Sequence, residues 1–358
     1  MEKSILFLGE YDINKFSRAR VLYKGLKKAG FHVDYCGDNT KRKYLILAKR
    51  LLKCDFKLLI VTSGIGIVLL CKLLQFIHRK PIILDELISV YDSSVFDRKV
   101  VKQHSLKARL LWFEDWLKCR LSNHIMVDTL EHADYFVRTF HIRVDKISVI
   151  LVGADNTIFK PSPIKNHKGF KVLFYGSFLP IHGVDIILNA AHILRNKPIK
   201  FFVMGRGRSI ITFNNALELS KKLELRNVYF DKKFLSSTIK IRNWIRSADI
   251  CLGVFGATLK ANRVIPYKVY ETLAMAKPLI TSNTQAIRTI GLMHKQQCYL
   301  IRGGNPEELA RAIMILYNNR RFRNRLGKNG YEWFIEHASI EKIALSFTTQ
   351  LCAKGIEI

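Results

Sequence analysis

Short apolar runs alternate with longer amphipathic segments along almost the whole chain. The runs are four to six residues long, and most end at, or one residue before, Gly, Asp, Ser or Thr, which is typical of buried strands. The predicted strands are 4–9, 31–35, 57–62, 81–85, 123–127, 146–151, 171–175, 199–204, 227–230, 249–254 and 279–282. Alternation of such strands with helices indicates parallel sheets that are covered on both faces.

The segments between the strands follow a helical period. The predicted helices are 14–29, 40–54, 65–78, 104–121, 129–139, 183–196, 210–224, 237–247, 267–276 and 306–318. A polar, proline-containing stretch at 160–169 interrupts the alternation and predicts a linker. We therefore expect an α/β protein with two doubly wound, Rossmann-like domains that face a cleft. Ligands of such sheets bind beyond the carboxyl ends of the strands.

The stretch 262–281 carries the most information about chemistry. Pro266 precedes a short helix, and Pro278 ends it before a buried strand. Lys268 and Glu271 lie on one face of this helix, so a cation and a carboxylate project together near free backbone N–H groups. A ligand with phosphates and a neighbouring diol, such as a nucleotide sugar, fits that arrangement. The alternative is a surface ion pair between residues i and i+3 on a packing helix.

Glycines follow several of the predicted strands. In such loops the backbone can approach a ligand closely and hold phosphate on its N–H groups; plain strand-to-helix turns are the alternative. The candidates of this kind, together with the cations beside them, are Gly9, Gly176, Gly183, Gly205, Arg206, Gly256 and Arg263.

Carboxylates mark strand ends in the first domain. Asp85 is the last residue of the strand 81–85, and we expect it to face the cleft and contact substrate. Asp128 ends another strand, where capping of the next helix is the expected role. No Ser/His/Asp or Cys/His set stands out in the sequence, and no His pair has metal-ligand spacing.

The net charge of +30 over 358 residues favours anionic partners. Residues 41–57 hold seven Lys or Arg and one Asp among several leucines, which fits either a helix in an anionic membrane interface or a basic surface helix. The apolar run 58–77 contains Thr62-Ser63-Gly64, so we interpret it as a strand and a helix and not as a membrane span. Seven scattered cysteines without a CxxC pair, and a first segment without signal-peptide features, indicate a cytoplasmic protein.

With these motifs in place, the chain resembles the retaining GT-B glycosyltransferases of the group 1, or family 4, type. The resemblance covers nearly the whole chain. It is most specific at 249–282, with its glycine loop and Pro-x-Lys-x-x-Glu helix, and extends to the stretch 152–161 and to Gly176 and Gly183. It implies an N-terminal acceptor-side domain at 1–160, a nucleotide-sugar-binding domain at 161–337 and a C-terminal helix at 338–358 that crosses back to the first domain.

The resemblance also implies roles for single residues. Glu271 matches the second Glu of the family's E-x7-E motif and would bind the ribose of the donor, but Arg263 stands where the first Glu is usual. The family's glycine loop usually offers an Arg and a Lys that clamp the diphosphate, and here Ser177 and His182 hold those places. Lys268, Arg263, Arg206 and a protonated His182 are the substitutes that remain. Asp85, Lys268 and Glu271 are the expected catalytic residues.

We therefore expect a metal-independent glycosyltransferase without a cofactor. It would move a hexose from a nucleotide sugar to a lipid-linked or polysaccharide acceptor in cell-envelope glycan assembly, at the inner face of the cell membrane. The alternatives are a basic nucleic-acid-binding protein, which only the charge supports, and a GT-B epimerase or hydrolase of nucleotide sugars.

Overall fold

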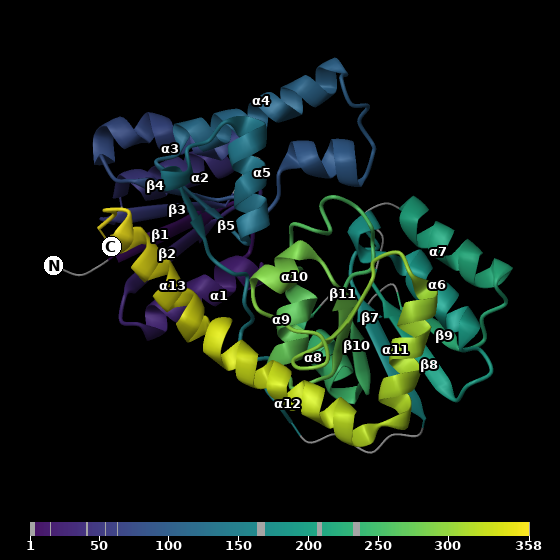
Figure 1. The fold of residues 1–358 in the computed structure, drawn as a ribbon. Coiled ribbons are helices and arrows are strands. Elements are labelled where there is room, and N and C mark those ends of the chain that lie inside the picture. The colour runs from purple at the N-terminus through teal and green to yellow at the C-terminus, as the bar shows by residue number, and fades with distance from the viewer. Residues whose placement is uncertain are drawn as a thin grey trace. The chain divides into compact units, whose positions relative to one another are not determined.

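The computed structural model describes residues 4–14, 16–40, 42–53, 55–62, 64–162, 169–205, 210–231 and 237–357. Within it the chain forms two compact units, Met1–Gly153 with Ala338–Ile358, and Ala154–His337 (Figure 1). The structure thus draws the first boundary at 153/154, where the sequence had placed it at 160/161. Most of the predicted linker, 163–168, lies outside the described residues.

Unit 1 contains a parallel six-stranded sheet in the order β2-β1-β3-β4-β5-β6. Its strands are β1 (Ser4–Gly9), β2 (His32–Gly37), β3 (Leu58–Thr62), β4 (Ile82–Asp85), β5 (His124–Val127) and β6 (Ile147–Val149). Its helices are α1 (Ser17–Lys28), α2 (Lys43–Lys53), α3 (Ile65–His78), η1 (Asp92–Asp97), α4 (Leu106–Leu121), α5 (Leu130–Phe140), η2 (Val144–Lys146) and α13 (Ile340–Ala353).

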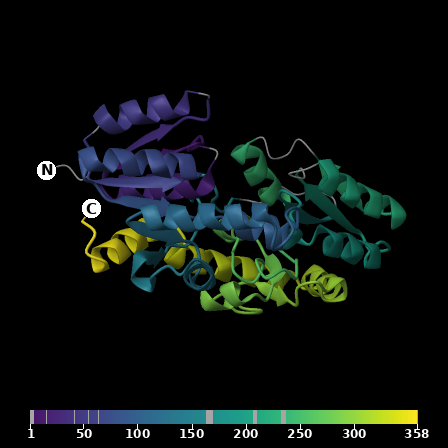
Figure 2. The ribbon, with the colours of Figure 1, turned by 90° about the horizontal axis from the view of Figure 1, so that it is seen from above.

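Both faces of this sheet are covered, as its apolar strands require. Alternate residues of β1 point to opposite faces: Leu6 and Leu8 pack in the core under α2 to α5, whereas Ile5 and Phe7 pack in the core under α1 and α13. Viewed from above, the helices lie on both sides of the strands (Figure 2). The last helix of the chain is therefore part of the first unit's core.

Unit 2 contains a second parallel sheet, in the order β12-β11-β10-β7-β8-β9. Its strands are β7 (Phe170–Tyr175), β8 (Ile199–Met204), β9 (Val228–Asp231), β10 (Ile250–Leu252), β11 (Leu279–Ser282) and β12 (Tyr299–Ile301). Its helices are η3 (Pro180–His182), α6 (Val184–Ile193), α7 (Ile210–Lys222), α8 (Thr238–Ser247), α9 (Tyr267–Ala274), α10 (Gln285–Thr289), α11 (Pro306–Asn318) and α12 (Arg320–His337).

The two predicted doubly wound α/β sheets are confirmed, and the cleft between them stays a prediction. In both sheets the strand order reverses next to the first strand, at β1/β3 in unit 1 and at β7/β10 in unit 2. Loops diverge at such a switch point and leave a crevice for ligands. The run 58–77 forms β3 and α3, as predicted.

Candidate functional site

The switch point of unit 2 brings three glycine loops together. Gly176 follows β7, and its N–H donates to Met204 O at the end of β8 (3.0 Å). The loop after β10 is tied to the loop after β7, because Gly256 N donates to Ile181 O (3.1 Å). The predicted glycines thus meet at the place where the topology predicts a ligand.

Close backbone contacts explain why glycine occupies two of these positions. Gly205 has a φ of 139°, and a Cβ there would lie 1.9 Å from Gly176 O. Gly183 has a φ of 60°, and a Cβ there would lie 2.7 Å from Gly256 N. Any larger residue would both strain the backbone and push the loops apart.

Lys268 is the most unusual side chain of this region. It is only 4% exposed, and its Nζ lies 4.0 Å from the centre of the Phe174 ring. Within the described part of the chain, Nζ has no hydrogen-bond partner. A Cβ on Gly176 would be 2.8 Å from this Nζ, so the amine lies directly beside the loop after β7. Burial holds the pKa of Lys268 well below its usual range, and Glu271 opposes that shift.

Glu271 lies one turn further along α9 and is 5% exposed. Its Oε2 accepts a hydrogen bond from the hydroxyl of Tyr175, at the end of β7 (2.7 Å). Burial and the nearby Glu271 raise the pKa of Tyr175, so its hydroxyl stays protonated and keeps donating. The alternative of a surface ion pair is therefore wrong, because both Lys268 and Glu271 are buried.

His182 corrects one expectation from the sequence. Burial, and then the charge of Lys268, lower the pKa of His182 well below its usual value, so the ring is neutral. Its Nδ1 accepts from Leu179 N (3.2 Å), which leaves the proton on Nε2. The residue offers an N–H donor and not the substitute cation that the sequence suggested.

The remaining predicted donor residues differ in their surroundings. Ser177 and Arg263 are half-buried, and Arg206 lies outside the described residues. Gly9 belongs to unit 1, where a Cβ would lie 2.1 Å from the Tyr11 ring and 2.6 Å from Thr62 O. Packing of Tyr11 and β3 thus accounts for glycine at position 9.

Asp85 ends β4 at the carboxyl edge of the unit 1 sheet, as predicted, and is 4% exposed. Its Oδ1 accepts from Arg18 Nε (2.8 Å), and Arg18 also donates to Ile150 O (2.6 Å). Burial raises the pKa of Asp85, and Arg18 opposes this. Sequence reasoning missed Arg18, because 67 residues separate the pair.

The next residue, Glu86, is also buried and paired. Lys118 Nζ lies 3.0 Å from Glu86 Oε1 and 3.1 Å from Asp115 Oδ1. Burial, opposed by Lys118, raises the pKa of Glu86 to about 7. The carboxyl edge of this sheet therefore holds two buried charge networks.

Asp128 does not cap α5, contrary to the sequence prediction. Thr129 is the N-cap, and its hydroxyl accepts from His132 N (3.1 Å). Asp128 Oδ1 instead lies 2.6 Å from His132 Nδ1, and both side chains are buried. In the described chain His132 Nε2 has no hydrogen-bond partner. This Asp–His pair at a strand's carboxyl end escaped the sequence analysis.

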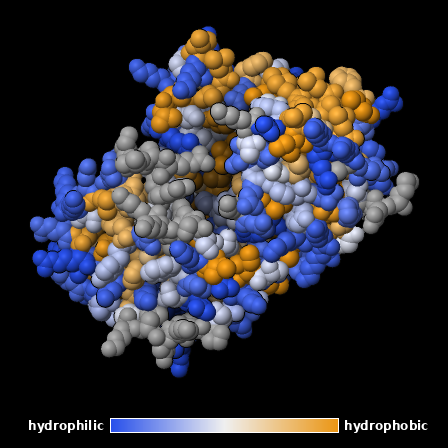
Figure 3. Space-filling view, turned by 180° about the vertical axis from the view of Figure 1, so that it is seen from behind, coloured by the Kyte–Doolittle hydropathy of each residue, from blue (hydrophilic) through white to orange (hydrophobic). Residues whose placement is uncertain are grey.

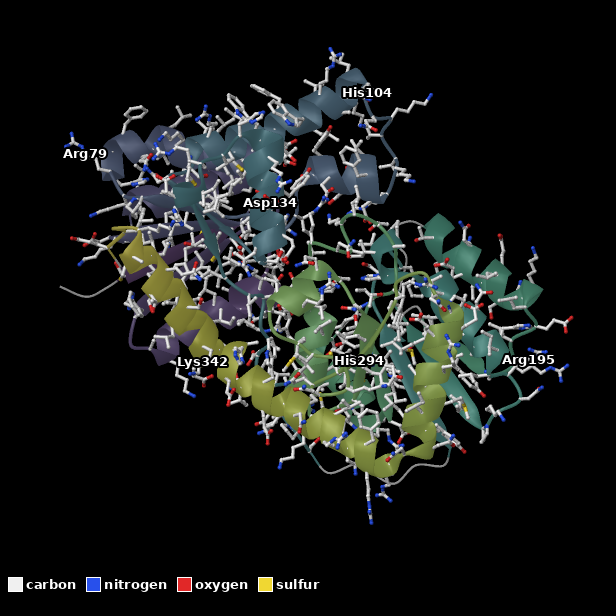
Figure 4. All side chains as sticks on the ribbon, viewed as in Figure 1. Arg79, His104, Asp134, Arg195, His294 and Lys342 are labelled. Atoms are coloured by element: carbon white, nitrogen blue, oxygen red, sulfur yellow. The ribbon has the colours of Figure 1, made fainter. Side chains whose placement is uncertain are left out.

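A pocket of about 680 Å³ lies in unit 2 at the carboxyl ends of β10 to β12. Gly256 is the predicted donor residue that lines it, together with Asn262, Ser282, Arg302 and His294, which Figure 4 labels. Its floor includes the end of β12, a strand that the sequence did not predict.

Among the described residues there is neither a candidate metal centre nor a helix that could span a membrane. None of their His, Cys, Asp and Glu side chains form a group of three or more that could hold a metal ion. None of the helices in the described ranges combines the length and the apolar character needed to cross a bilayer.

Residues 169–319 match the model of the family "Glycosyl transferases group 1". No protein of curated function matches the chain. Several solved structures share its fold. Sucrose-phosphate synthase from Thermosynechococcus elongatus has a TM-score of 0.75 at 16% identity, over 98% of this chain and 100% of that one.

Two other solved structures contain ligands. HepE from Anabaena, in complex with UDP and glucose, has a TM-score of 0.72 at 16% identity, over 98% of this chain and 100% of that one. TarM from S. aureus, in a complex that includes UDP, has a TM-score of 0.65 at 16% identity, over 86% of this chain and 58% of that one. The chain therefore carries a group 1 glycosyltransferase domain in unit 2 and has the GT-B fold, which confirms the predicted family, fold and enzyme class.

Proposed function

We propose that this glycosyltransferase binds the diphosphate of a nucleotide sugar at the three glycine loops of unit 2. The buried Nζ of Lys268, beside Gly176 and without a hydrogen-bond partner among the described residues, is the observation that carries the proposal. An amine without a counter-charge in hydrogen-bond contact is costly to bury, and a diphosphate would supply such a contact. His182 would add a neutral N–H donor, and Glu271, held by Tyr175, would accept from the ribose hydroxyls. The proposed donor site is completed by Ser177, Gly183, Gly205, Arg206, Gly256 and Arg263. Gly9, in unit 1, remains a proposed donor-binding residue.

The reaction that fits these residues is retaining and metal-independent. The bond between the sugar's anomeric carbon and the phosphate oxygen breaks, and a bond from that carbon to the acceptor oxygen forms on the same face. The proton of the acceptor hydroxyl passes to the departing phosphate oxygen. The protein then has to position the two substrates and stabilise the charge on the diphosphate. Asp85, held by Arg18, is assigned to the acceptor side as a positioning residue.

UDP is the first nucleotide to test, because HepE and TarM contain it in their structures. A thermal-shift series with UDP, GDP, ADP, dTDP and CMP would compare the wild type with Glu271→Ala. Ligand at 100 times Kd adds about 2.7 kcal/mol of stability. We expect UDP to stabilise the wild type, and Glu271→Ala to lose this response.

The matched control is Glu307→Ala, which removes an exposed carboxylate from the same unit. It should respond to UDP like the wild type. If none of the nucleotides stabilises the wild type at millimolar concentration, the proposed donor site is refuted. A UDP-hexose incubated alone tests the epimerase and hydrolase alternatives, since a transferase should not release free sugar or a new epimer at a comparable rate.

The acceptor is proposed to be lipid-linked or a polysaccharide of the cell envelope, with the enzyme peripheral at the inner face of the membrane. Support comes from α2 and α3, which contact each other and contain no acidic residue. Leu47 and Leu51 of α2 pack on the sheet, whereas the outer side chains of α2 to α4 include exposed apolar ones: Leu45, Leu52, Leu73, Phe76, Ile77 and Leu110. Apolar side chains gather over this part of unit 1 (Figure 3), and Arg79 at the end of α3 points away from the ribbon (Figure 4).

Flotation with phosphatidylglycerol vesicles at low salt tests the membrane proposal. We expect the wild type to float, and Phe76→Ser combined with Ile77→Ser to lose most of this binding, because exposed apolar side chains insert into the interface. An exposed pair in unit 2, Ile239→Ser with Leu259→Ser, is the matched control. A wild type that stays in the soluble fraction would contradict the proposal.

A further inference from the structure

A second cavity lies at the opposite edge of the unit 1 sheet, where the strands begin. Its volume is about 1000 Å³, and it is lined by residues that precede β3, β4 and β5 and by the ends of α4 and α13. The carboxyl ends of the strands, with Asp85 and Asp128, form the other edge of the same parallel sheet. This cavity is therefore separate from the charge networks of the carboxyl edge.

Cations dominate the lining. Six of them come from separate elements of the unit: Lys57, Lys72, Lys80, Arg120, Lys146 and Lys354. A seventh, Arg143, pairs with Asp145 (2.5 Å), and Glu357 is the other carboxylate of the lining. Seven cationic side chains and two carboxylates leave five net positive charges around one cavity.

The negative C-termini of helices offset part of this positive charge. α4 and α13 both end at the cavity, and each C-terminus carries about half a negative charge. Lys146 satisfies such an end, since its Nζ donates to Cys119 O (2.6 Å) and Arg120 O (3.2 Å). The two termini together offset about one charge, which leaves about four positive charges uncompensated. Among the described residues, no carboxylate lies within 4.0 Å of the side-chain nitrogen of Lys57, Lys80 or Lys354.

His124, which lines the cavity, is affected by these positive charges. His124 begins β5, is 2% exposed, and its Nε2 lies 2.9 Å from Ser148 Oγ. Burial, and then the charges of Lys354 and Lys146, lower the pKa of His124 to about 4. The ring is therefore neutral and adds no charge of its own.

We propose that this cavity binds a phosphate-bearing anion through Lys57, Lys80, Arg120 and Lys354. Phosphate oxygens accept several charge-assisted hydrogen bonds at once, and a bound anion would remove the repulsion among these side chains. The anion has two possible sources, a phospholipid headgroup or a free phosphate compound. The first is favoured by the neighbouring end of α3, where Leu73, Phe76 and Ile77 are exposed beside Lys72 and Lys80.

Calorimetry with pyrophosphate and flotation with phosphatidylglycerol vesicles test the two sources in the full-length protein. The variant combines Lys57→Gln, Lys80→Gln and Lys354→Gln. The control combines Lys240→Gln, Lys328→Gln and Lys342→Gln, which removes the same charge from exposed positions outside the cavity. Pyrophosphate binding is also measured in Lys268→Met. Binding at the donor loops requires Lys268, whereas binding in the cavity does not, so this variant distinguishes the two sites.

We expect the cavity variant to bind at least one of the two ligands about tenfold or more weakly, and the control to bind like the wild type. A free phosphate compound would be assigned if the cavity variant loses pyrophosphate binding while Lys268→Met retains it. Loss of vesicle binding alone would assign a lipid headgroup. Equal losses in the cavity variant and the control would reduce the effect to overall charge and overturn the proposal, as would a cavity variant that binds both ligands like the wild type.

Discussion

At the scale of single residues, we expect Lys268 to contribute to UDP affinity but not to the free energy of unfolding. Its buried amine has no hydrogen-bond partner in the described chain, so the folded protein gains little from its charge. Lys268→Met removes the contact of Nζ with the Phe174 ring but also the cost of burying the amine, so the free energy of unfolding should stay unchanged or rise. A lost charge-assisted hydrogen bond is worth about 1.5–3 kcal/mol, so UDP should bind roughly 10- to 100-fold more weakly.

Chemical denaturation and calorimetry measure these two quantities for Lys268→Met. Lys295→Met, an exposed lysine of the same unit, is the control and should change neither. A variant that is strongly destabilised but still binds UDP would show that Lys268 has a structural role instead.

Protonation of Lys268 should accompany nucleotide binding. Because burial lowers its pKa, the free amine loses its proton at a pH well below that of an exposed lysine. A bound diphosphate favours the charged amine and raises this pKa, so the complex takes up a proton when the pH lies above the lowered pKa and below the raised one. His182 contributes nothing, because its lowered pKa keeps it neutral in this range.

Calorimetry at about pH 8 in buffers of different ionisation enthalpy counts the protons taken up. At this pH the phosphates are fully ionised, since their second pKa is about 6. We expect net uptake by the wild type and none by Lys268→Met. Equal uptake by both proteins would assign the proton to another group.

At the scale of elements, the packing of the glycine loops should control nucleotide binding. Gly205→Ala places a Cβ 1.9 Å from Gly176 O at a φ of 139°, so the loop after β7 has to move. We expect a loss of roughly 1–3 kcal/mol in the free energy of unfolding and a clear loss of UDP affinity. Gly169→Ala is the control, because Gly169 has a φ of 79° but no atom within 4 Å of the added Cβ. It should lose stability but keep its affinity, and equal affinities in the two variants would contradict the prediction.

The same elements show what the sequence can predict. Runs such as 4–9 and 279–282 are apolar, long enough and bounded by turn residues, so their strands were predicted at the observed positions. α10 has only five residues, too few for a helical period to show. β12 (Tyr299–Ile301) was missed with it, because without a recognised helix after β11 the alternation of strands and helices did not extend to this run.

The site was predictable only in part. Lys268 and Glu271 lie close in sequence, and the helical period placed them together. The partners that hold site residues come from far away: 96 residues separate Tyr175 from Glu271, and 67 separate Arg18 from Asp85. Nothing local in the sequence marks such pairs, because the fold alone brings them within hydrogen-bond distance. The neutral state of His182 likewise follows from burial, which a loop sequence does not reveal.

At the scale of the whole molecule, the chain ends in the unit where it begins. Phe347 of α13 is fully buried in the core that α13 shares with α1, and Gln350 Nε2 donates to Val149 O (2.7 Å). Phe347→Ala should therefore cost about 3–5 kcal/mol, and it should act on unit 1. Unit 2 has its own core, built from residues between 170 and 326, and should keep its affinity for UDP.

Hydrogen exchange of the full chain, read peptide by peptide, distinguishes the two units. In Phe347→Ala we expect faster exchange in β1, β3 and α1 and unchanged exchange in β7, β8 and α6, with the thermal response to UDP retained. Leu345→Ala, at an exposed position on the same helix, is the control and should exchange like the wild type. If exchange in Phe347→Ala instead rises equally in both units, the two cores unfold as one cooperative body. The C-terminal helix would then stabilise the nucleotide site as well as the sheet on which it packs.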